Sequence, residues 1–166
     1  MKYKLDNKKV LITGASGGIG KSLCEKFIGS NCNIVCTSSS IEKLDNLKYL
    51  YGNNHNYYLL NFSNSNSFFD SIKQIAQEHR DIDILINNAG ITKDNIIARM
   101  SMDEWEEVIN IHLNATFYMC QRATKLMMKN RFGRVINISS TSATIGNRGQ
   151  GNYAAAKAGI EAFTRD

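Results

Sequence analysis

The sequence of 166 residues contains no proline, although average usage would give about eight in a chain of this length. It has no apolar run near the roughly 18 residues needed to cross a bilayer, and its first ten residues are charged and lack the apolar core of a signal peptide. These absences argue against a membrane span and a secretory leader within the printed residues. We expect a cytoplasmic protein, or one of an organelle matrix if a targeting peptide lies outside this sequence.

The cysteines show neither a C-x-x-C pair nor the spacing of a zinc site. There are four of them, Cys24, Cys32, Cys36 and Cys120. We interpret them as small buried hydrophobic residues in a reducing compartment, and we expect no metal. With 43% hydrophobic and 21% charged residues, the composition indicates one folded globular domain over residues 1–166.

Acidic residues are absent from positions 108–160, whereas seven basic residues lie there: Arg122, Lys125, Lys129, Arg131, Arg134, Arg148 and Lys157. The formal net charge of +5 therefore belongs to one region. Without aromatic residues interleaved on a repeating register, this region argues weakly for nucleic acid and better for an acidic protein partner or a phosphorylated substrate. The alternative is a solvated positive face without a partner.

Short apolar runs alternate with segments of helical periodicity along the whole chain. They predict strands over residues 9–13, 33–37, 57–61, 82–86 and 134–138, and helices over 18–30, 41–50, 64–77, 103–129 and 153–163. Ser63 or Asn64 is expected to cap the third helix, and Ser101 with Glu104 forms a capping box for the fourth. This order predicts an α/β fold: a doubly wound parallel sheet of the Rossmann type in three αβα layers, with ligands bound beyond the carboxyl ends of the strands.

A glycine-rich loop follows the first predicted strand and opens the first predicted helix: Thr13-Gly14-Ala15-Ser16-Gly17-Gly18-Ile19-Gly20. A tight turn from strand to helix needs glycine where φ is positive, and a phosphate reaches backbone N–H groups at a helix start only where no Cβ intervenes. We expect Gly14, Gly18 and Gly20 to cradle the pyrophosphate of a dinucleotide.

Three motifs stand in a fixed order: T-G-x-x-x-G-x-G at residues 13–20, N-N-A-G at 87–90, and Tyr153-x-x-x-Lys157 with Ser140 thirteen residues before the tyrosine. Together they resemble the short-chain dehydrogenase/reductase family. The connecting stretches 88–100, 127–140 and 146–159 are similar to the 3-oxoacyl-[acyl-carrier-protein] reductases of bacterial and organellar fatty acid synthesis.

The resemblance implies that Tyr153 donates a proton to a substrate ketone as a nicotinamide delivers hydride. A phenol is a poor acid or base at neutral pH, but an ammonium four residues away on the same helix face favours the phenolate. The resemblance implies that Lys157 also holds the nicotinamide ribose. Ser140, with Ser139 as the alternative, would hydrogen-bond the carbonyl oxygen. The family places an asparagine where this chain has His112. That histidine is either a buried core residue or a modified proton relay whose charge responds to pH.

The resemblance also implies a set of cofactor-binding residues: Gly14, Ser16, Gly17, Gly18, Ile19, Gly20, Thr37, Ser39, Asn61, Phe62, Asn88, Ala89, Gly90, Tyr153 and Lys157. A site that prefers NAD needs an acid after the second strand to hold the ribose hydroxyls, but this chain has only threonine and serines there. The absence of a carboxylate favours NADP(H). Related reductases often carry an arginine at the position of Gly17, where this chain has no side chain.

The same resemblance suggests acyl carrier protein as the acidic partner, docked on Lys129 and Arg131, with an acyl thioester as substrate. Related reductases continue beyond the tyrosine helix and form tetramers, so we expect a longer protein and a homotetramer. Two other functions stay open: reduction of another carbonyl compound, such as acetoacetyl-CoA or a small ketone, and a non-catalytic nucleotide-binding fragment.

Overall fold

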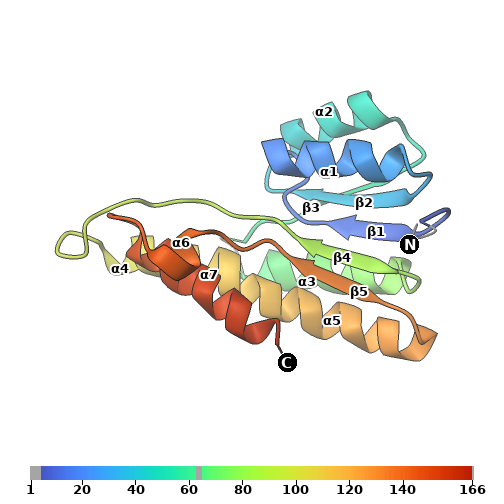
Figure 1. The fold of residues 1–166 in the computed structure, drawn as a ribbon. Coiled ribbons are helices and arrows are strands. Elements are labelled where there is room, and N and C mark those ends of the chain that lie inside the picture. Colours follow the sequence, from blue (N-terminus) through green and yellow to red (C-terminus); the bar gives the residue numbers. More distant parts are fainter. Residues whose placement is uncertain (1–4, 63–64, 166) are drawn as a thin grey trace.

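The computed structural model describes residues 5–62 and 65–165, in which strands and helices alternate (Figure 1). The strands are β1 (Lys9–Ile12), β2 (Asn33–Ser38), β3 (Asn56–Leu59), β4 (Ile84–Asn87) and β5 (Arg134–Asn137). The helices are α1 (Gly18–Ile28), α2 (Ile41–Tyr51), α3 (Ser65–Glu78), α4 (Met102–Ile109), α5 (Ala115–Asn130), α6 (Ser142–Ile145) and α7 (Gly151–Phe163), with a π-helical turn η1 (Asn110–Asn114) between α4 and α5.

The strands form one sheet in the order β3-β2-β1-β4-β5, and each neighbouring pair is parallel. The chain moves outward from β1 to β3 and then returns to place β4 on the other side of β1. This reversal confirms the doubly wound α/β fold and puts the topological switch point between β1 and β4, where such sheets bind ligands.

Side chains of the sheet alternate between two apolar layers, as a sheet buried on both faces requires. Val10 and Ile12 face α1 and α2 together with Cys24 and Cys36, whereas Leu11 faces α3 and α5 together with Met119. In Figure 1, α1 and α2 cover one face of the sheet, and α3, α5 and α7 lie on the other. The four cysteines are all buried and free, which confirms their interpretation as small apolar residues.

The capping box at the start of α4 is confirmed, because the Ser101 hydroxyl accepts from Glu104 N–H at 3.1 Å and the Glu104 carboxylate accepts from Ser101 N–H at 2.7 Å. The cap expected at Ser63 or Asn64 lies outside the described residues. The tyrosine helix begins at Gly151, two residues before the expected start.

The long helix expected over residues 103–129 is not one uninterrupted α-helix. The π turn η1 divides it, and η1 contains His112. On both sides of this turn the same face is buried, with Val108, Ala115, Met119 and Ala123 in the core and Arg122 exposed. Sequence periodicity missed the turn because the buried residues Val108, His112, Ala115 and Met119 still follow at intervals of three and four, as in an uninterrupted helix.

No helix in the described part of the chain is both long enough and apolar enough to span a bilayer.

Candidate active site

The Thr13 hydroxyl ties the carboxyl end of β1 to that of β4. It accepts from the backbone N–H groups of Asn88 and Ala89, each at 3.0 Å, and lies 3.4 Å from the carbonyl oxygen of Ile86. The Asn88 amide donates back to the carbonyl oxygens of Thr13 and Gly14, both at 3.1 Å. A hydroxyl has one donor and two acceptor sites, so Thr13 is fully used in this clamp.

Two glycines of the loop are required by close backbone packing. Gly14 has φ +63°, and a Cβ there would lie 2.7 Å from the Ala89 Cα. A Cβ at Gly20 would overlap the carbonyl oxygen of Gly14 and the backbone of Ala15. Gly18 differs, because a Cβ there would meet no protein atom within 4 Å. Close packing therefore explains the glycines at positions 14 and 20, whereas Gly18 leaves the backbone open to approach.

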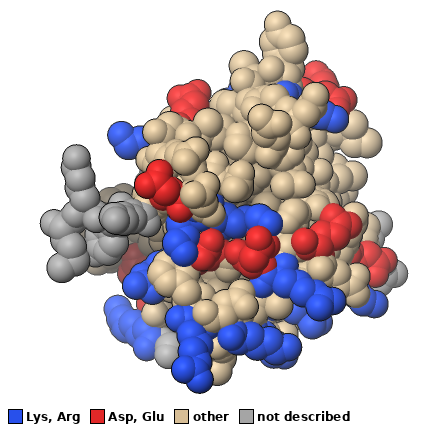
Figure 2. Space-filling view, turned by 90° about the vertical axis from the view of Figure 1, so that its right-hand side faces the viewer, with Lys and Arg blue, Asp and Glu red and all other residues tan. Residues whose placement is uncertain are grey.

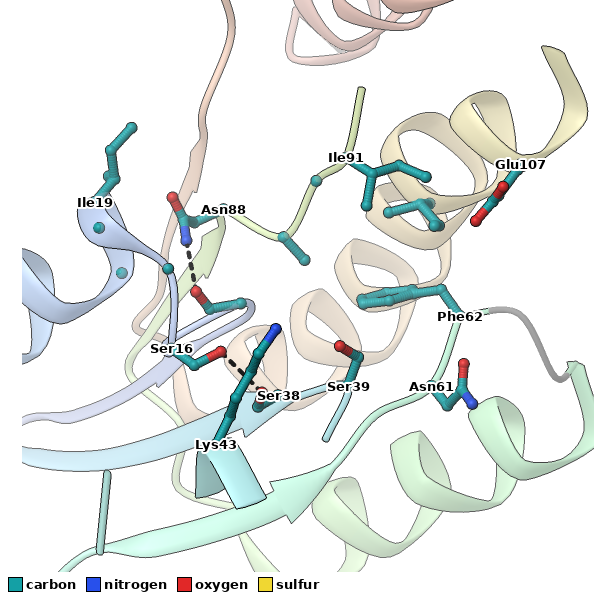
Figure 3. A pocket seen from close by; sticks show the side chains of 17 residues that line it. Ser16, Ile19, Ser38, Ser39, Lys43, Asn61, Phe62, Asn88, Ile91 and Glu107 are labelled. Carbon is teal, nitrogen blue, oxygen red and sulfur yellow. Dashed lines mark hydrogen bonds between the residues drawn. The ribbon is translucent and has the colours of Figure 1, made fainter. Parts of the chain in front are cut away.

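A cavity of about 510 Å³ lies over these loops, beyond the carboxyl ends of β1, β2 and β4 (Figure 3). It is lined by Gly14, Ser16, Gly17, Gly18, Ile19, Gly20, Ser38, Ser39, Lys43, Asn61, Phe62, Asn88, Ala89, Gly90, Ile91, Glu107 and Ile111. Twelve of the residues predicted to bind a cofactor are among them. The cavity therefore gathers nearly the whole predicted set at the switch point of the sheet.

Thr37 is the exception at this end of the cavity. Its side chain is fully buried, and its hydroxyl has no hydrogen-bond partner among the described residues. The prediction that Thr37 reaches the cofactor is thus not supported, because β2 continues one residue further than expected and Thr37 is still inside the sheet. Ser38 lines the cavity instead, and its hydroxyl lies 2.8 Å from that of Ser16.

Lys43 is a cavity residue that the sequence reasoning missed. It lies in the first turn of α2, and Figure 3 shows its ammonium group rising beside Ser16, Ser38 and Ser39. The expected helix over 41–50 already placed Lys43 in its first turn, close to the strand end where a ribose was expected. That position in the predicted helix was the signal in the sequence for a cation near the ribose.

His112 lies against the cavity wall and beside Tyr153. It is 2% exposed, its Nε2 is 2.8 Å from the Ile91 carbonyl oxygen, and its ring stands edge-on to that of Tyr153 with centroids 5.1 Å apart. A Cβ at Gly90 would overlap the His112 ring. Nε2 is also 3.1 Å from the Ile91 backbone nitrogen, and because one ring nitrogen cannot donate and accept at once, the tautomer decides which of these two bonds forms. Nδ1 has no partner among the described residues.

Burial, followed by the charge of Lys157, lowers the pKa of His112 to about 4, although its hydrogen bond to Ile91 opposes this. This low pKa favours a neutral imidazole near neutrality. His112 is neutral from about pH 5 upward, because a cation at this position would be desolvated and would face a second cation.

Tyr153 and Lys157 lie on one face of α7, as their spacing predicted, with the Lys157 ammonium 5.7 Å from the Tyr153 ring centroid. Lys157 is 4% exposed, and its Nζ donates to the carbonyl oxygen of Ile138 at 2.5 Å. Burial lowers the pKa of Lys157 from its ordinary 10.5 to about 8. The bond to Ile138 fixes α7 against the segment that follows β5, two residues before Ser140.

The two serines after β5 have different partners. The Ser139 hydroxyl donates to the Glu161 carboxylate at 2.6 Å, whereas the Ser140 hydroxyl accepts only a weak bond, at 3.2 Å, from Ser142 N–H at the start of α6. Ser140 thus keeps its proton available to a ligand. This difference favours Ser140 over the alternative Ser139. Ser140, Tyr153 and Lys157 are not among the residues that line the cavity. His112 contacts both Ile91 and Tyr153, and so connects Tyr153 to the cavity wall.

Lys129 and Arg131 lie at the other edge of the sheet. α5 precedes β5, so its last turn lies where the strands begin, opposite the cavity. Both residues are exposed, and Arg131 ends the helix with φ 52°. Figure 2, which faces this edge, shows Lys and Arg side chains gathered on its lower part with Asp and Glu between them. A carrier docked there would not face the cavity of the same chain.

A doubly wound parallel sheet with a glycine loop and a cavity at its switch point defines a dinucleotide-binding α/β domain. A family model described as short chain dehydrogenase matches residues 8–166. The chain belongs to the short-chain dehydrogenase family.

Several relatives are known by sequence. The chain is 40% identical over 161 residues to the 3-oxoacyl-[acyl-carrier-protein] reductase FabG of Buchnera aphidicola subsp. Schizaphis graminum, which covers 96% of this chain and 66% of that protein. It is 41% identical over 161 residues to the FabG reductase of Vibrio harveyi, which covers 97% of this chain and 66% of that protein. The chain spans just under two thirds of the length of these curated relatives.

Solved structures agree with this assignment. A short chain dehydrogenase from Bacillus anthracis superposes with a TM-score of 0.87 at 33% identity, over 97% of this chain and 68% of the other. A short chain dehydrogenase/reductase family protein superposes with a TM-score of 0.90 at 24% identity, over 98% of this chain and 68% of the other, which bears on the fold alone.

Alanine substitutions at two glycines will separate packing from access. Gly20→Ala is expected to lower the free energy of unfolding by about 2 kcal/mol or more, because its Cβ would overlap fixed backbone. Gly18→Ala is expected to change it by less than about 1 kcal/mol, because its Cβ would meet open space. Urea unfolding of the two variants and the parent measures this difference, and equal stabilities would contradict the packing role of Gly20.

The buried cation of Lys157 makes stability depend on pH. Below pH 8 the folded protein must keep a desolvated charge, whereas between pH 8 and 10.5 it releases a proton that the unfolded chain retains. Relative to Lys157→Met, the free energy of unfolding of the parent should therefore rise over this range, by up to about 3 kcal/mol. Urea titrations at pH 7, 8, 9 and 10 test this, and parallel pH profiles for both proteins would refute it.

Proposed function

We propose that the protein containing this chain reduces the ketone of a 3-oxoacyl thioester carried by acyl carrier protein, with NADPH as the reductant. The observation that carries this proposal is the grouping of Tyr153, Lys157 and His112 beside the wall of a glycine-lined cavity. The names of the relatives add support, since several are 3-oxoacyl-[acyl-carrier-protein] reductases.

The cavity fits a dinucleotide by its own construction. Gly17, Gly18 and Ile19 lie at the start of α1, where backbone N–H groups lack helical partners and attract phosphate, and Gly18 leaves the approach open. Asn61 and Phe62 would hold the adenine, and Asn88 to Gly90 would form the opposite wall. When bound, NADPH supplies the hydride for the reduction.

Tyr153 is proposed as the proton donor to the ketone oxygen. The phenolate left behind is stabilised by the ammonium of Lys157, which the bond to Ile138 holds near the same face of α7. The ketone carbon gains a C–H bond from the hydride, and the ketone oxygen gains an O–H bond from the phenol. Bulk solvent then returns a proton to Tyr153.

Ser140 is proposed to donate a hydrogen bond to the same ketone oxygen, where negative charge develops during hydride transfer. His112 is proposed to act without charge. Its ring edge meets the Tyr153 ring and so restricts the direction of the phenol. The neutral imidazole replaces the family's asparagine as a positioning group rather than as a second acid.

The preference for NADPH is proposed from the β2 end of the cavity. Ser38 and Ser39 offer hydroxyls there, and Lys43 supplies a positive charge suited to a 2′-phosphate. Glu107 is the one acidic residue among the described lining residues. It lies on α4, and its carboxylate pairs with Lys93 at 3.2 Å. The described lining at the β2 end contains no Asp or Glu that would repel the phosphate.

Docking of acyl carrier protein on Lys129 and Arg131 is proposed to involve a second copy of the chain, as in a homotetramer. The outer side of α4 carries Asp103 and Glu106, and the later turns of α5 carry Arg122 and Lys125. An antiparallel pairing of two copies would set these opposite charges together. It would also bring the basic edge of one copy toward the cavity of the other. We place this reaction in the cytoplasm, with an organelle matrix as the alternative.

Steady-state NADPH oxidation by the full-length protein, with acetoacetyl-carrier protein and acetoacetyl-CoA as alternative substrates, tests the proposed function. We expect the carrier-bound substrate to have the higher kcat/KM. Tyr153→Phe should lower kcat about 10²- to 10⁴-fold, because the variant keeps the ring but loses the proton, while NADPH binding measured by fluorescence is unchanged. Equal rates for parent and variant would leave a nucleotide-binding protein, and a preference for CoA or small ketones would indicate another carbonyl reductase.

Removal of the Lys43 charge tests the cofactor preference. Lys43→Ala is expected to raise KM for NADPH about 10-fold and to leave KM for NADH within twofold, since a charge-assisted bond to phosphate is lost only with NADPH. Lys48→Ala is the matched control, because Lys48 lies on the same helix but does not line this cavity. An equal effect of Lys43→Ala on both cofactors would reject its role toward the 2′-phosphate.

A further inference from the structure

We propose that Asn152 is a positioning residue for Tyr153, a role that rests on the proposed reductase function. Asn152 directly precedes Tyr153 and is fully buried at the start of α7. Its side chain joins three separate segments of the chain: the loop after β4, the helix α4 and the first turn of α7. Through these bonds it sets where the tyrosine enters the site.

The hydrogen bonds of Asn152 use each of its polar atoms. Its Nδ2 donates to the carbonyl oxygen of Lys93 at 3.0 Å and to that of Glu104 at 3.1 Å. Its Oδ1 accepts from the N–H of Tyr153 at 2.7 Å. That N–H belongs to the first turn of a helix, where backbone donors have no partner within the helix.

These partners allow only one orientation of the amide. Two carbonyl oxygens can only accept, and one N–H can only donate, so the side chain must present NH₂ to the first pair and oxygen to the last. Among residues of similar size, aspartate has the same shape but would turn two donations into contacts between oxygens. The site therefore selects an amide, because the shape alone would not satisfy the partners.

The loop that Asn152 holds continues from the cavity wall. Gly90 and Ile91 line the cavity, and the next residues join the start of α7 at further points. Asn95 N–H donates to the Gly149 carbonyl oxygen at 2.8 Å, and the Gln150 amide donates to the Asp94 carboxylate at 3.0 Å.

Of the residues whose side chains join this loop to the start of α7, Asn152 is the one that is fully buried. The position of the Tyr153 backbone is thus fixed relative to the wall against which a nicotinamide would lie.

The test compares the full-length parent with Asn152→Ala, Asn152→Asp and the control Asn147→Ala. Asn147 is exposed on the same segment, and among the described residues its side chain bonds only the Gln150 side chain. Rates are expressed per active site, counted by titration with NADPH fluorescence, so a partly unfolded sample does not imitate a catalytic defect. Solvent deuterium isotope effects on kcat report the proton step.

We expect both Asn152 variants to lower kcat at least 10-fold per active site, to leave KM for NADPH within twofold, and to raise the solvent isotope effect above that of the parent. Asn147→Ala should match the parent in all three. An unchanged kcat per active site, an unchanged isotope effect, or failure of both Asn152 variants to fold would overturn the proposal and make Asn152 a structural residue. Absence of NADPH-dependent turnover in the parent would instead reject the proposed function.

Discussion

The site depends on the direct contact of two backbone segments at the carboxyl ends of β1 and β4. Gly14 and Ala89 approach so closely that no Cβ fits between them, and the Thr13 hydroxyl holds both strands at that separation. Parallel strands that diverged here would open the floor of the cavity to solvent. Because the two segments are in direct contact, the glycine-rich loop and the opposite wall, Asn88 to Ile91, form two sides of one cavity.

The second side of that cavity also governs the residues proposed for chemistry. Ile91 meets the His112 ring, and His112 meets the Tyr153 ring, so a chain of contacts runs from the wall to α7. Lys157 meanwhile bonds the carbonyl oxygen of Ile138 after β5. The tyrosine helix is therefore held from the β4 side and from the β5 side. A rigid placement of this kind is what orientation in catalysis requires.

Much of this arrangement could be predicted from the sequence because it is local. The unbroken apolar runs indicated a parallel sheet, and the spacing of Tyr153 and Lys157 placed both on one helix face. Contacts between distant segments could not be predicted in that way. Thr37 was assigned to the cavity because strand ends are uncertain by a residue, and that single residue decides which side chain is buried.

Other features depend on how separate elements pack together, and hydrophobic periodicity carries no information about that. They are the place of Lys43 in the cavity, the π turn around His112 and the three hydrogen-bond partners of Asn152.

The charge of the site follows from its burial. His112 and Lys157 share one desolvated region, and two cations there would repel each other in a medium that screens poorly. The histidine, with the weaker hold on its proton, is neutral from about pH 5 upward, and the lysine keeps its proton up to about pH 8. Between these limits the site holds one cation at a fixed position. An asparagine in place of His112 would give the same single charge, so the histidine preserves the electrostatics of the site while adding a ring that contacts Tyr153.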